Sequence, residues 1–228
     1  MKPLYIIIGA YGSGKSEFSI HLAKSLNLSD NKVVLADMDV VNPYFRTREV
    51  QEEFAKLGIE VIAPEGQFKH ADLPMLSPSI KGAIENYDKT VILDVGGDPV
   101  GCKILGRFQT EIETRGYQML FVVNTYRPFT TSIEEILQMK EQLEASSRLK
   151  VTEFICNNNL MEYTTREVVE EGIQILIECS EKTGLPFNYY LVLDLYQDRV
   201  PDGLMGKKRV IMNYTFKKPW EYYVMKGI

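Results

Sequence analysis

The stretch Leu4-Tyr5-Ile6-Ile7-Ile8-Gly9-Ala10-Tyr11-Gly12-Ser13-Gly14-Lys15-Ser16 decides the fold of this chain. Its first five residues form an apolar run of the kind found in a strand that is buried on both faces. Residues 9–16 match the pattern G-x-x-x-x-G-K-[ST] at every specified position. Residues 16–26 follow with apolar side chains at helical spacing. A strand, a glycine-rich loop and a helix in this order predict a loop that binds phosphate groups.

The residue types in this loop suit the chemistry of phosphate binding. Glycines permit the backbone angles that turn successive N–H groups toward an anion, and the next helix adds the positive end of its dipole. Lys15 can reach the β- and γ-phosphates, and the Ser16 hydroxyl can bind Mg²⁺. The alternative is a glycine-rich turn that binds nothing. The expected nucleotide contacts are Gly9, Tyr11, Gly12, Ser13, Gly14, Lys15, Ser16 and Glu17.

Short apolar runs and amphipathic stretches alternate along the rest of the chain. They predict strands at 32–36, 60–63, 90–93, 118–123, 152–156 and 188–193, and helices at 49–57, 79–87, 102–115, 132–145 and 165–182. This order predicts a three-layer α/β fold, in which helices flank a mostly parallel sheet of about seven strands. We expect a single domain over residues 1–228. Its C-terminal extension, from about residue 207 to 228, should add a strand and a tail.

Composition excludes several classes of protein. The 228 residues are 45% hydrophobic and 25% charged, which is typical of a globular chain. No apolar run reaches the roughly 18 residues of a membrane span, and residues 4–8 are too short for a signal peptide. The net charge of −5 argues against binding nucleic acid over the whole surface. Three widely spaced cysteines argue against a disulfide framework or a zinc site, so we expect a cytoplasmic protein.

Acidic residues follow two of the predicted strands. Asp37 and Asp39 come after the second strand, and residues two apart in a strand point to the same side. Asp94 ends the apolar run at 90–93, an arrangement that holds Mg²⁺ directly or through water. Because the carboxyl ends of parallel strands meet at one edge, we expect Asp37, Asp39 and Asp94 to converge on the phosphate loop, where Ser16 and Asp94 can bind Mg²⁺. The alternatives are a solvated acidic turn for the first pair and a strand cap for Asp94.

These motifs resemble the MinD/ParA/CobQ-type branch of P-loop NTPases, the SIMIBI class that includes signal-recognition GTPases and metal-cluster maturation ATPases. The loop at 9–16, Asp37 with Asp39, and Asp94 before Gly96-Gly97 carry the resemblance, which spans most of residues 4–160. It implies that Asp39 acts with Lys15 in catalysis by orienting or activating the attacking water. It also implies that Asp37 helps to hold the Mg²⁺ shell. Residues 39–48 and 94–101 would be the first and second switches.

The chain departs from this family at Ala10. Many members carry a lysine there, which crosses a dimer interface and contacts the partner's nucleotide. The resemblance therefore leaves a homodimer open and does not imply one. Arg46 or Arg48 could supply positive charge instead, or they could be surface arginines at the start of a helix.

The residues expected near the base favour adenine over guanine. GTPases of this group read guanine with N/T-K-x-D, whereas the matching segment here is Cys156-Asn157-Asn158-Asn159, without Lys or Asp. Amide side chains can pair with the donor and acceptor edge of adenine, although runs of asparagine also form turns. In related ATPases an asparagine at this strand end and a proline-containing loop flank the adenine. That resemblance implies contacts from Asn157, Asn158 and Pro201.

These expectations predict a Mg²⁺-dependent ATPase that acts as a nucleotide-driven switch or assembly factor for a partner protein. One alternative is a small-molecule kinase or ATP-dependent ligase of similar fold, with residues 64–78 shaping an acceptor pocket. The others are a GTPase and a binding-only switch with negligible turnover. The sequence contains no feature that indicates a nucleic-acid partner.

Overall fold

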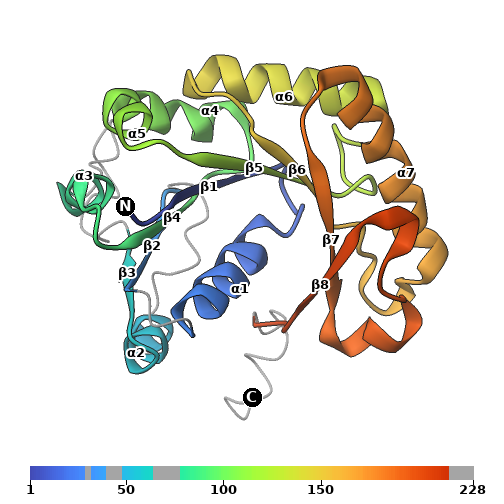
Figure 1. The fold of residues 1–228 in the computed structure, drawn as a ribbon, viewed down its shortest axis with the longest axis horizontal. Helices are drawn as coiled ribbons and strands as arrows, with labels where there is room; N and C mark the ends of the chain where they lie inside the picture. The colour runs from blue at the N-terminus through green and yellow to red at the C-terminus, as the bar shows by residue number, and fades with distance from the viewer. Residues whose placement is uncertain (29–31, 40–47, 64–77, 216–228) are drawn as a thin grey trace, which may run out of the picture.

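A parallel sheet runs through the computed structural model, which describes residues 1–28, 32–39, 48–63 and 78–215 (Figure 1). Its order among these residues is β3-β2-β4-β1-β5-β6-β7-β8, and every neighbouring pair is parallel. The predicted α/β fold is confirmed, and the strand expected in the C-terminal extension is the eighth. The strands are β1 (Leu4–Ile8), β2 (Val33–Asp37), β3 (Ile59–Ile62), β4 (Thr90–Asp94), β5 (Gln118–Val123), β6 (Glu153–Cys156), β7 (Phe187–Leu193) and β8 (Lys208–Met212).

Helices cover both faces of the sheet and complete three layers (Figure 1). Two separate groups of buried apolar residues mark the two faces, one including Phe18 and Phe54 and the other Leu143 and Ile173. None of the helices in the described ranges combines the length and apolar character that a bilayer span requires. On one face lie α1 (Lys15–Asn27) and α2 (Arg48–Lys56), and on the other α3 (Pro78–Glu85), α4 (Pro99–Cys102), α5 (Gln109–Arg115), α6 (Ile133–Ser147) and α7 (Arg166–Thr183).

The single helix predicted over residues 102–115 is wrong. The chain turns into α4 earlier, because Asp98 caps that helix and Pro99 occupies its first turn. A 3-10 helix, Lys103–Arg107, follows, and α5 begins only at Gln109. Phe108 separates the two with φ −115° and ψ 12°, outside helical geometry, and Gly106 weakens the helix just before it. The spacing of apolar residues over 102–115 is compatible both with one continuous helix and with the shorter helices observed, so it does not reveal the break.

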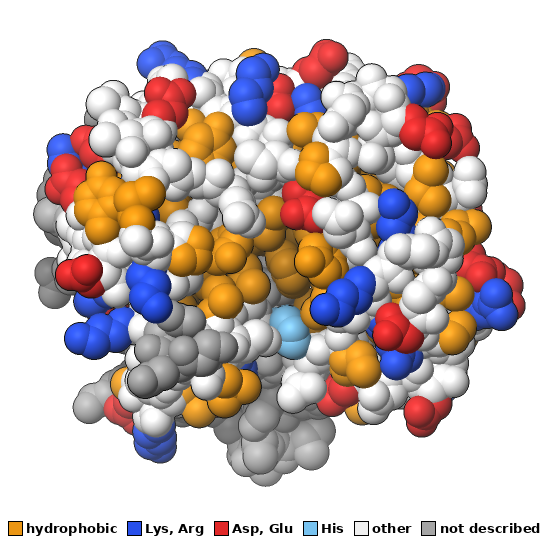
Figure 2. All heavy atoms as spheres, viewed as in Figure 1, with side chains coloured by type: hydrophobic (Ala, Val, Ile, Leu, Met, Phe, Trp, Pro, Cys, Tyr) orange, Lys and Arg blue, Asp and Glu red, His pale blue; other side chains and the backbone are white. Residues whose placement is uncertain are grey.

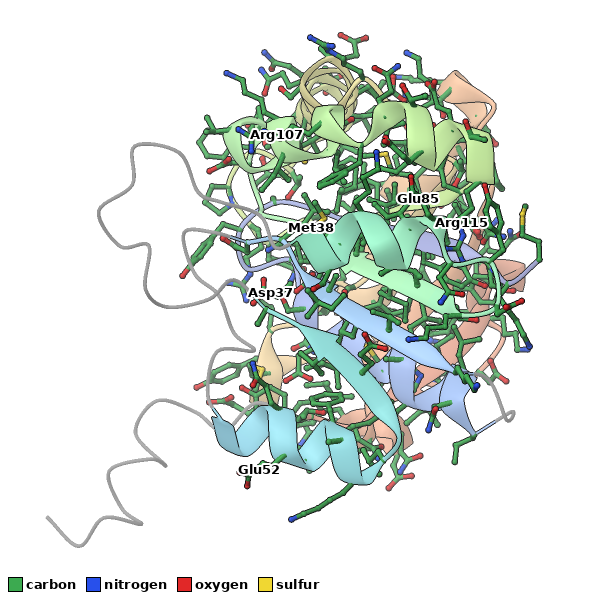
Figure 3. All side chains as sticks on the ribbon, turned by 90° about the vertical axis from the view of Figure 1, so that its left-hand side faces the viewer. Asp37, Met38, Glu52, Glu85, Arg107 and Arg115 are labelled. Atoms are coloured by element: carbon green, nitrogen blue, oxygen red, sulfur yellow. The ribbon has the colours of Figure 1, made fainter. Side chains whose placement is uncertain are left out.

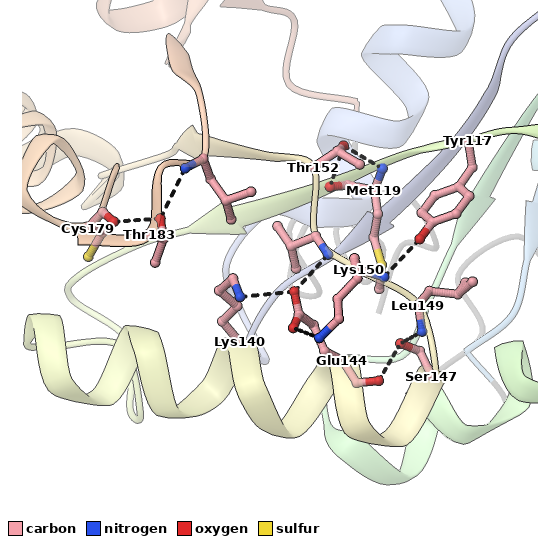
Figure 4. Close-up of polar contacts among 12 residues, drawn as sticks. Tyr117, Met119, Lys140, Glu144, Ser147, Leu149, Lys150, Thr152, Cys179 and Thr183 are labelled. Atoms are coloured by element: carbon pink, nitrogen blue, oxygen red, sulfur yellow. Dashed lines mark hydrogen bonds and ion pairs between the residues drawn. The ribbon is translucent and has the colours of Figure 1, made fainter. Parts of the chain in front are cut away.

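Glu144 ties the end of α6 to the start of β6 (Figure 4). Its buried carboxylate accepts a hydrogen bond from the backbone N–H of Val151 at 3.0 Å. It also pairs with Lys140 at 3.0 Å and with Lys150 at 2.9 Å. Thr152 then bonds the backbone of Met119 on β5. These contacts hold β5 and β6 in register, so that their far ends reach the candidate site.

A cavity of about 330 Å³ lies beside α1, at the amino ends of the strands. Figure 2 shows hydrophobic side chains in a hollow on this face, with a histidine at its edge. The residues that line the cavity include Phe18, His21 and Tyr189. Burial and the nearby Lys24 lower the pKa of His21. Because the phosphate loop follows the carboxyl end of β1, this hollow is separate from the candidate site.

Candidate functional site

The phosphate loop, residues 9–16, joins β1 to α1 at the carboxyl ends of the strands. Gly12 and Gly14 adopt φ values of +74° and +87°, which glycine reaches without strain. The Ser13 N–H donates to the Ala10 carbonyl at 3.1 Å and closes the turn between them. A Cβ atom at Gly9 would lie 2.4 Å from the Val122 carbonyl oxygen, so β5 leaves room only for glycine. The predicted strand, loop and helix are confirmed.

Lys15, Ser19 and Asp94 are buried together at the start of α1. The exposed fraction is 7% for Lys15 and 1% for Asp94. The Ser19 hydroxyl lies 3.1 Å from Asp94 Oδ1 and 2.9 Å from the Lys15 carbonyl oxygen, so it bridges the helix and the end of β4. The structure thus brings the predicted lysine and carboxylate together. Sequence analysis missed Ser19, although it lies one helical turn beyond Lys15 and shares its helix face.

Burial and neighbouring groups shift the pKa of Asp94 in opposite directions. Burial raises the pKa of Asp94 to about 6, and the charge of Asp39 adds to the rise. Lys15 and the hydroxyls of Ser16 and Ser19 act in the opposite direction. A buried carboxylate in this state is stabilised by either a proton or a cation. The group therefore suits a metal ion bound next to Ser16.

Asp37 and Asp39 complete the acidic edge of the sheet. Asp37 ends β2 directly opposite Asp94 on β4, and it is equally buried. Its Oδ1 accepts the Asp39 N–H at 3.0 Å, which fixes the turn after the strand. Asp39 is half-buried and faces the Gly96 backbone. Parallel register thus brings the predicted carboxylates together.

The donor set fits Mg²⁺ better than a metal that needs a complete protein cage. Among the described residues, no three His, Cys, Asp or Glu side chains converge as a metal site. Ser16 and Asp94 offer a hydroxyl and a carboxylate, with Asp37 beside them. Mg²⁺ uses few protein ligands and completes its octahedron with water and phosphate oxygens.

The predicted second switch, residues 94–101, lies directly against the phosphate loop. A Cβ atom at Gly97 would be 2.9 Å from the Tyr11 nitrogen, and one at Gly101 would be 2.9 Å from the Gly96 Cα. Only glycine lets the backbone approach this closely at both positions. Of the predicted first switch, residues 40–47 lie outside the described part of the chain. Arg46 lies there too, as does the Arg48 side chain.

The two predicted asparagines have different environments. Asn157 Nδ2 donates to the Ser13 carbonyl at 2.7 Å, while its buried Oδ1 has no hydrogen-bond partner among the residues that the structure describes. The side-chain amide of Asn158 instead forms hydrogen bonds within the protein. Its Oδ1 accepts the Thr125 N–H at 3.0 Å, and its Nδ2 donates to the Thr125 hydroxyl and the Val168 carbonyl. Of these two asparagines, Asn157 is the one whose side chain keeps an amide atom without a partner among the described residues.

A small cavity of about 90 Å³ adjoins the loop at Gly12 and Gly14. Asn157 and Arg127 line it, and Arg127 Nε donates to the Gly12 carbonyl at 3.0 Å. Tyr214, just beyond β8, forms part of another wall. The exposed Pro201 does not line this cavity, and its carbonyl accepts a hydrogen bond from the Tyr190 hydroxyl.

Arg127 and Tyr214 were not predicted as site residues from the sequence. The only signal for Tyr214 is the aromatic residues after the last strand, and nothing in the local pattern marks Arg127. Glu17, expected as a nucleotide contact, also lines the cavity and accepts the Thr215 N–H at 3.1 and 3.2 Å. Glu17 therefore ties the segment after β8 to α1.

Residues 4–182 match the model of the CobQ/CobB/MinD/ParA nucleotide-binding domain. The chain belongs to this family. It is therefore a nucleotide-binding domain with the P-loop NTPase fold, as the resemblance implied. No curated protein matches the chain.

Solved structures share the fold of this CobQ/CobB/MinD/ParA domain. Cell division protein FtsY from Thermotoga maritima matches with a TM-score of 0.56 and 19% identity, covering 84% of this chain and 62% of that one. The signal recognition particle receptor FtsY from Elizabethkingia anophelis, in complex with GDP, has a TM-score of 0.53 and 17% identity, covering 84% and 58%. This chain thus spans about three fifths of the FtsY chains. At these identities the likeness concerns the fold alone.

The buried carboxylate of this CobQ/CobB/MinD/ParA domain leads to a pH prediction. Because the folded-state pKa of Asp94 is about 6, above its ordinary 3.8, this group stabilises the fold below about pH 4. That contribution is lost as the pH rises to 6, and the total is about 3 kcal/mol. Without nucleotide and Mg²⁺, Asp94→Asn should therefore raise the free energy of unfolding at pH 7 and flatten its pH dependence. Urea titrations between pH 4 and 7.5 measure both effects.

The matched control for this prediction is Asp88→Asn, which changes an exposed carboxylate. It should keep the pH dependence of the unmodified protein. If Asp94→Asn has that same dependence, Asp94 is not the group that titrates.

Proposed function

We propose that this nucleotide-binding domain binds Mg²⁺–ATP, hydrolyses its γ-phosphate and uses the change of state as a switch for a partner protein. One observation carries the proposal: Lys15 is buried beside Asp94 and Ser19, directly after a turn in which Gly12 and Gly14 have positive φ. Burying the positive charge of a lysine costs free energy. Phosphate groups bound at the start of the helix would compensate for that cost.

Each part of the site has a distinct role in this proposal. The N–H groups of the phosphate loop and Lys15 hold the phosphates, and Asp39 positions the attacking water. Ser16 and Asp94 would hold Mg²⁺, and Asp37 would help to hold it. Mg²⁺ when bound neutralises charge on the phosphate oxygens. Catalysis then rests on positioning and on preorganised electrostatics.

Asn157 supports adenine as the base. Its Nδ2 donates to the Ser13 carbonyl, so the side-chain atom left without a partner among the described residues is the buried acceptor Oδ1. One neutral acceptor suits the single exocyclic amino group of adenine. Guanine presents two neighbouring donors, which a carboxylate matches better. We do not propose Asn158 or Pro201 as base contacts, because Asn158 is bonded internally and Pro201 lies outside the small cavity.

The contact between Gly97 and Tyr11 supports the switch. The second switch rests on the backbone of the phosphate loop, so a change in the phosphates can reach α4 through one packed contact. A partner protein that binds near α4 would sense this change. A second copy of the chain is one such partner, without the lysine exchange that Ala10 excludes.

Asp39→Ala is the test of hydrolysis. It should leave the affinity for Mg²⁺–ATP within about twofold and reduce turnover at least about a hundredfold, as expected when a water-positioning group is removed. Binding is measured by calorimetry with ATP and with GTP, and turnover by release of inorganic phosphate. Asp88→Ala is the control.

Unchanged turnover in Asp39→Ala would remove Asp39 from the mechanism. Tighter binding of GTP than of ATP would overturn the choice of base. If ATP is consumed only when a metabolite is added, and the phosphate appears on that metabolite, the protein is a kinase or ligase and not an ATPase.

A further inference from the structure

We propose that a cavity beside the phosphate loop binds a small organic cation, namely an amine or guanidinium carried on an apolar stem. The cavity measures about 580 Å³ and lies between the phosphate loop, residues 97–99, residues 128–129 and α6. We call it the cation cavity. Its volume is in the range of small-molecule sites. The inference goes beyond hydrolysis, since it concerns a second ligand and is tested without nucleotide.

Two aromatic rings from different loops line the cation cavity. Tyr11 is 74% exposed and Phe129 is 69% exposed, so neither ring is packed in the core. Two exposed rings at one concave site indicate a ligand, because a solvated ring gains little for the protein alone. An aromatic face attracts a cation, and the attraction is stronger when the cation is partly desolvated.

The backbone holds Phe129 in a strained conformation. Its φ of +67° lies in the left-handed region, which a bulky side chain rarely adopts. The neighbouring Thr130 is fully buried, and its hydroxyl donates to the carbonyls of Asn124 at 2.8 Å and Arg127 at 3.1 Å. The segment thus imposes the strain and directs an exposed ring to the cavity. Such strain is typical of binding sites.

The charged groups of the cation cavity are acidic. Asp98 and Glu135 line it, and no Lys, Arg or His is found among its described lining residues. The hydroxyl and N–H of Thr131 lower the pKa of Glu135, which keeps that carboxylate charged. Asp98 Oδ1 accepts the Gly101 N–H at 2.6 Å, which fixes the orientation of its carboxylate. Two anchored carboxylates favour a positively charged ligand.

Apolar side chains of the cavity wall can contact the apolar stem of the ligand. Met139 of α6 lines the cavity together with Pro99 and Pro128, and these side chains provide no charge. A stem of several methylene groups is stabilised by burial against these side chains, and the stabilisation grows with each methylene group buried. The combination of aromatic, apolar and acidic walls selects an amphipathic cation over a fully polar one such as ammonium.

The test uses hexylamine and hexylguanidine as probes, with hexanol and hexanoate as neutral and anionic analogues. Saturation-transfer NMR on the nucleotide-free protein should detect the two cations. Hexanol should bind at least about fivefold more weakly, and hexanoate should not bind. Gln138→Lys, which adds a positive charge at an exposed position of the cavity wall, should weaken hexylamine binding at least about tenfold.

Two further variants keep the test decisive. Gln174→Lys makes the same change at an exposed position of α7, away from the cavity, and should leave hexylamine binding unchanged. Phe129→Gly removes the ring while relieving the positive φ, so it should weaken binding without lowering the melting temperature. Equal binding of hexanol and hexylamine overturns the proposal, as does unchanged binding to Gln138→Lys. Failure of ATP binding would not affect these readouts, so the two proposals fail separately.

Discussion

Replacing Lys15 by methionine is expected to lower the affinity for Mg²⁺–ATP at least about a hundredfold, which corresponds to about 3 kcal/mol. Lys15 is the single positive side chain within the phosphate loop, and it is almost fully buried. Methionine keeps an apolar stem of similar length, so the change removes charge and hydrogen-bond donors more than volume. Calorimetric titration with Mg²⁺–ATP measures the loss.

The same substitution should change the acid titration of the nucleotide-free protein. Lys15 lowers the pKa of Asp94, against the larger effect of burial. Without Lys15, the pKa of Asp94 should rise further, and the loss of stability with increasing pH should extend above pH 6. Lys182→Met, on the exposed surface of α7, should change neither affinity nor titration. Full ATP affinity in Lys15→Met would contradict the entire assignment of the site.

The parts of the site that the sequence predicts are those set by regular geometry. Residues 9–16 specify their own turn, because glycine is needed where φ is positive. Asp37 and Asp94 meet because parallel strands in register end at the same edge, and the apolar runs locate those strand ends. Neither step depends on the details of side-chain packing. The fold, and the meeting of Asp37 and Asp94 at one edge of the sheet, can therefore be predicted from the sequence.

Other features depend on contacts between distant residues, and local patterns do not contain them. Asn157 and Asn158 look alike in sequence, yet Asn158 is hydrogen-bonded to Thr125, and one atom of Asn157 has no partner among the described residues. Arg127 reaches Gly12 across 115 positions of sequence. The break before α5 keeps the apolar spacing of a continuous helix, so periodicity alone cannot reveal it.

Arg115→Met is expected to destabilise the fold by about 3–5 kcal/mol, because each buried acceptor that is left without a donor costs about 1–3 kcal/mol and several lose theirs together. The side chain is 1% exposed and lies at the end of the sheet opposite Asp37 (Figure 3). No carboxylate pairs with it among the described residues. Its guanidinium instead donates to six backbone carbonyls, those of Lys2, Pro3, Ala83, Ile84, Asn86 and Lys89.

These six acceptors explain the size of the expected effect. Arg115 joins the entry to β1, the end of α3 and the start of β4, and methionine would remove a donor from each of these carbonyls in a buried place. The carbonyls of Pro3, Ala83 and Asn86 would keep a backbone N–H donor. Urea unfolding should therefore order the proteins as unmodified, then Arg115→Lys, then Arg115→Met, because an ammonium can satisfy only some of the acceptors. Arg166→Met, which breaks an exposed pair with Glu170, should cost less than about 1 kcal/mol.

The location of Arg115 separates this prediction from the proposals on function. It lies away from the phosphate loop, so Arg115→Lys that remains folded should bind Mg²⁺–ATP with unchanged affinity while unfolding at lower urea concentration. Equal stability of Arg115→Met and the unmodified protein would mean that water or a shift of α3 satisfies the carbonyls. A loss of ATP affinity in folded Arg115→Lys would instead mean that the two ends of the sheet are coupled through β1 and β4, whose carboxyl ends carry the phosphate loop and Asp94.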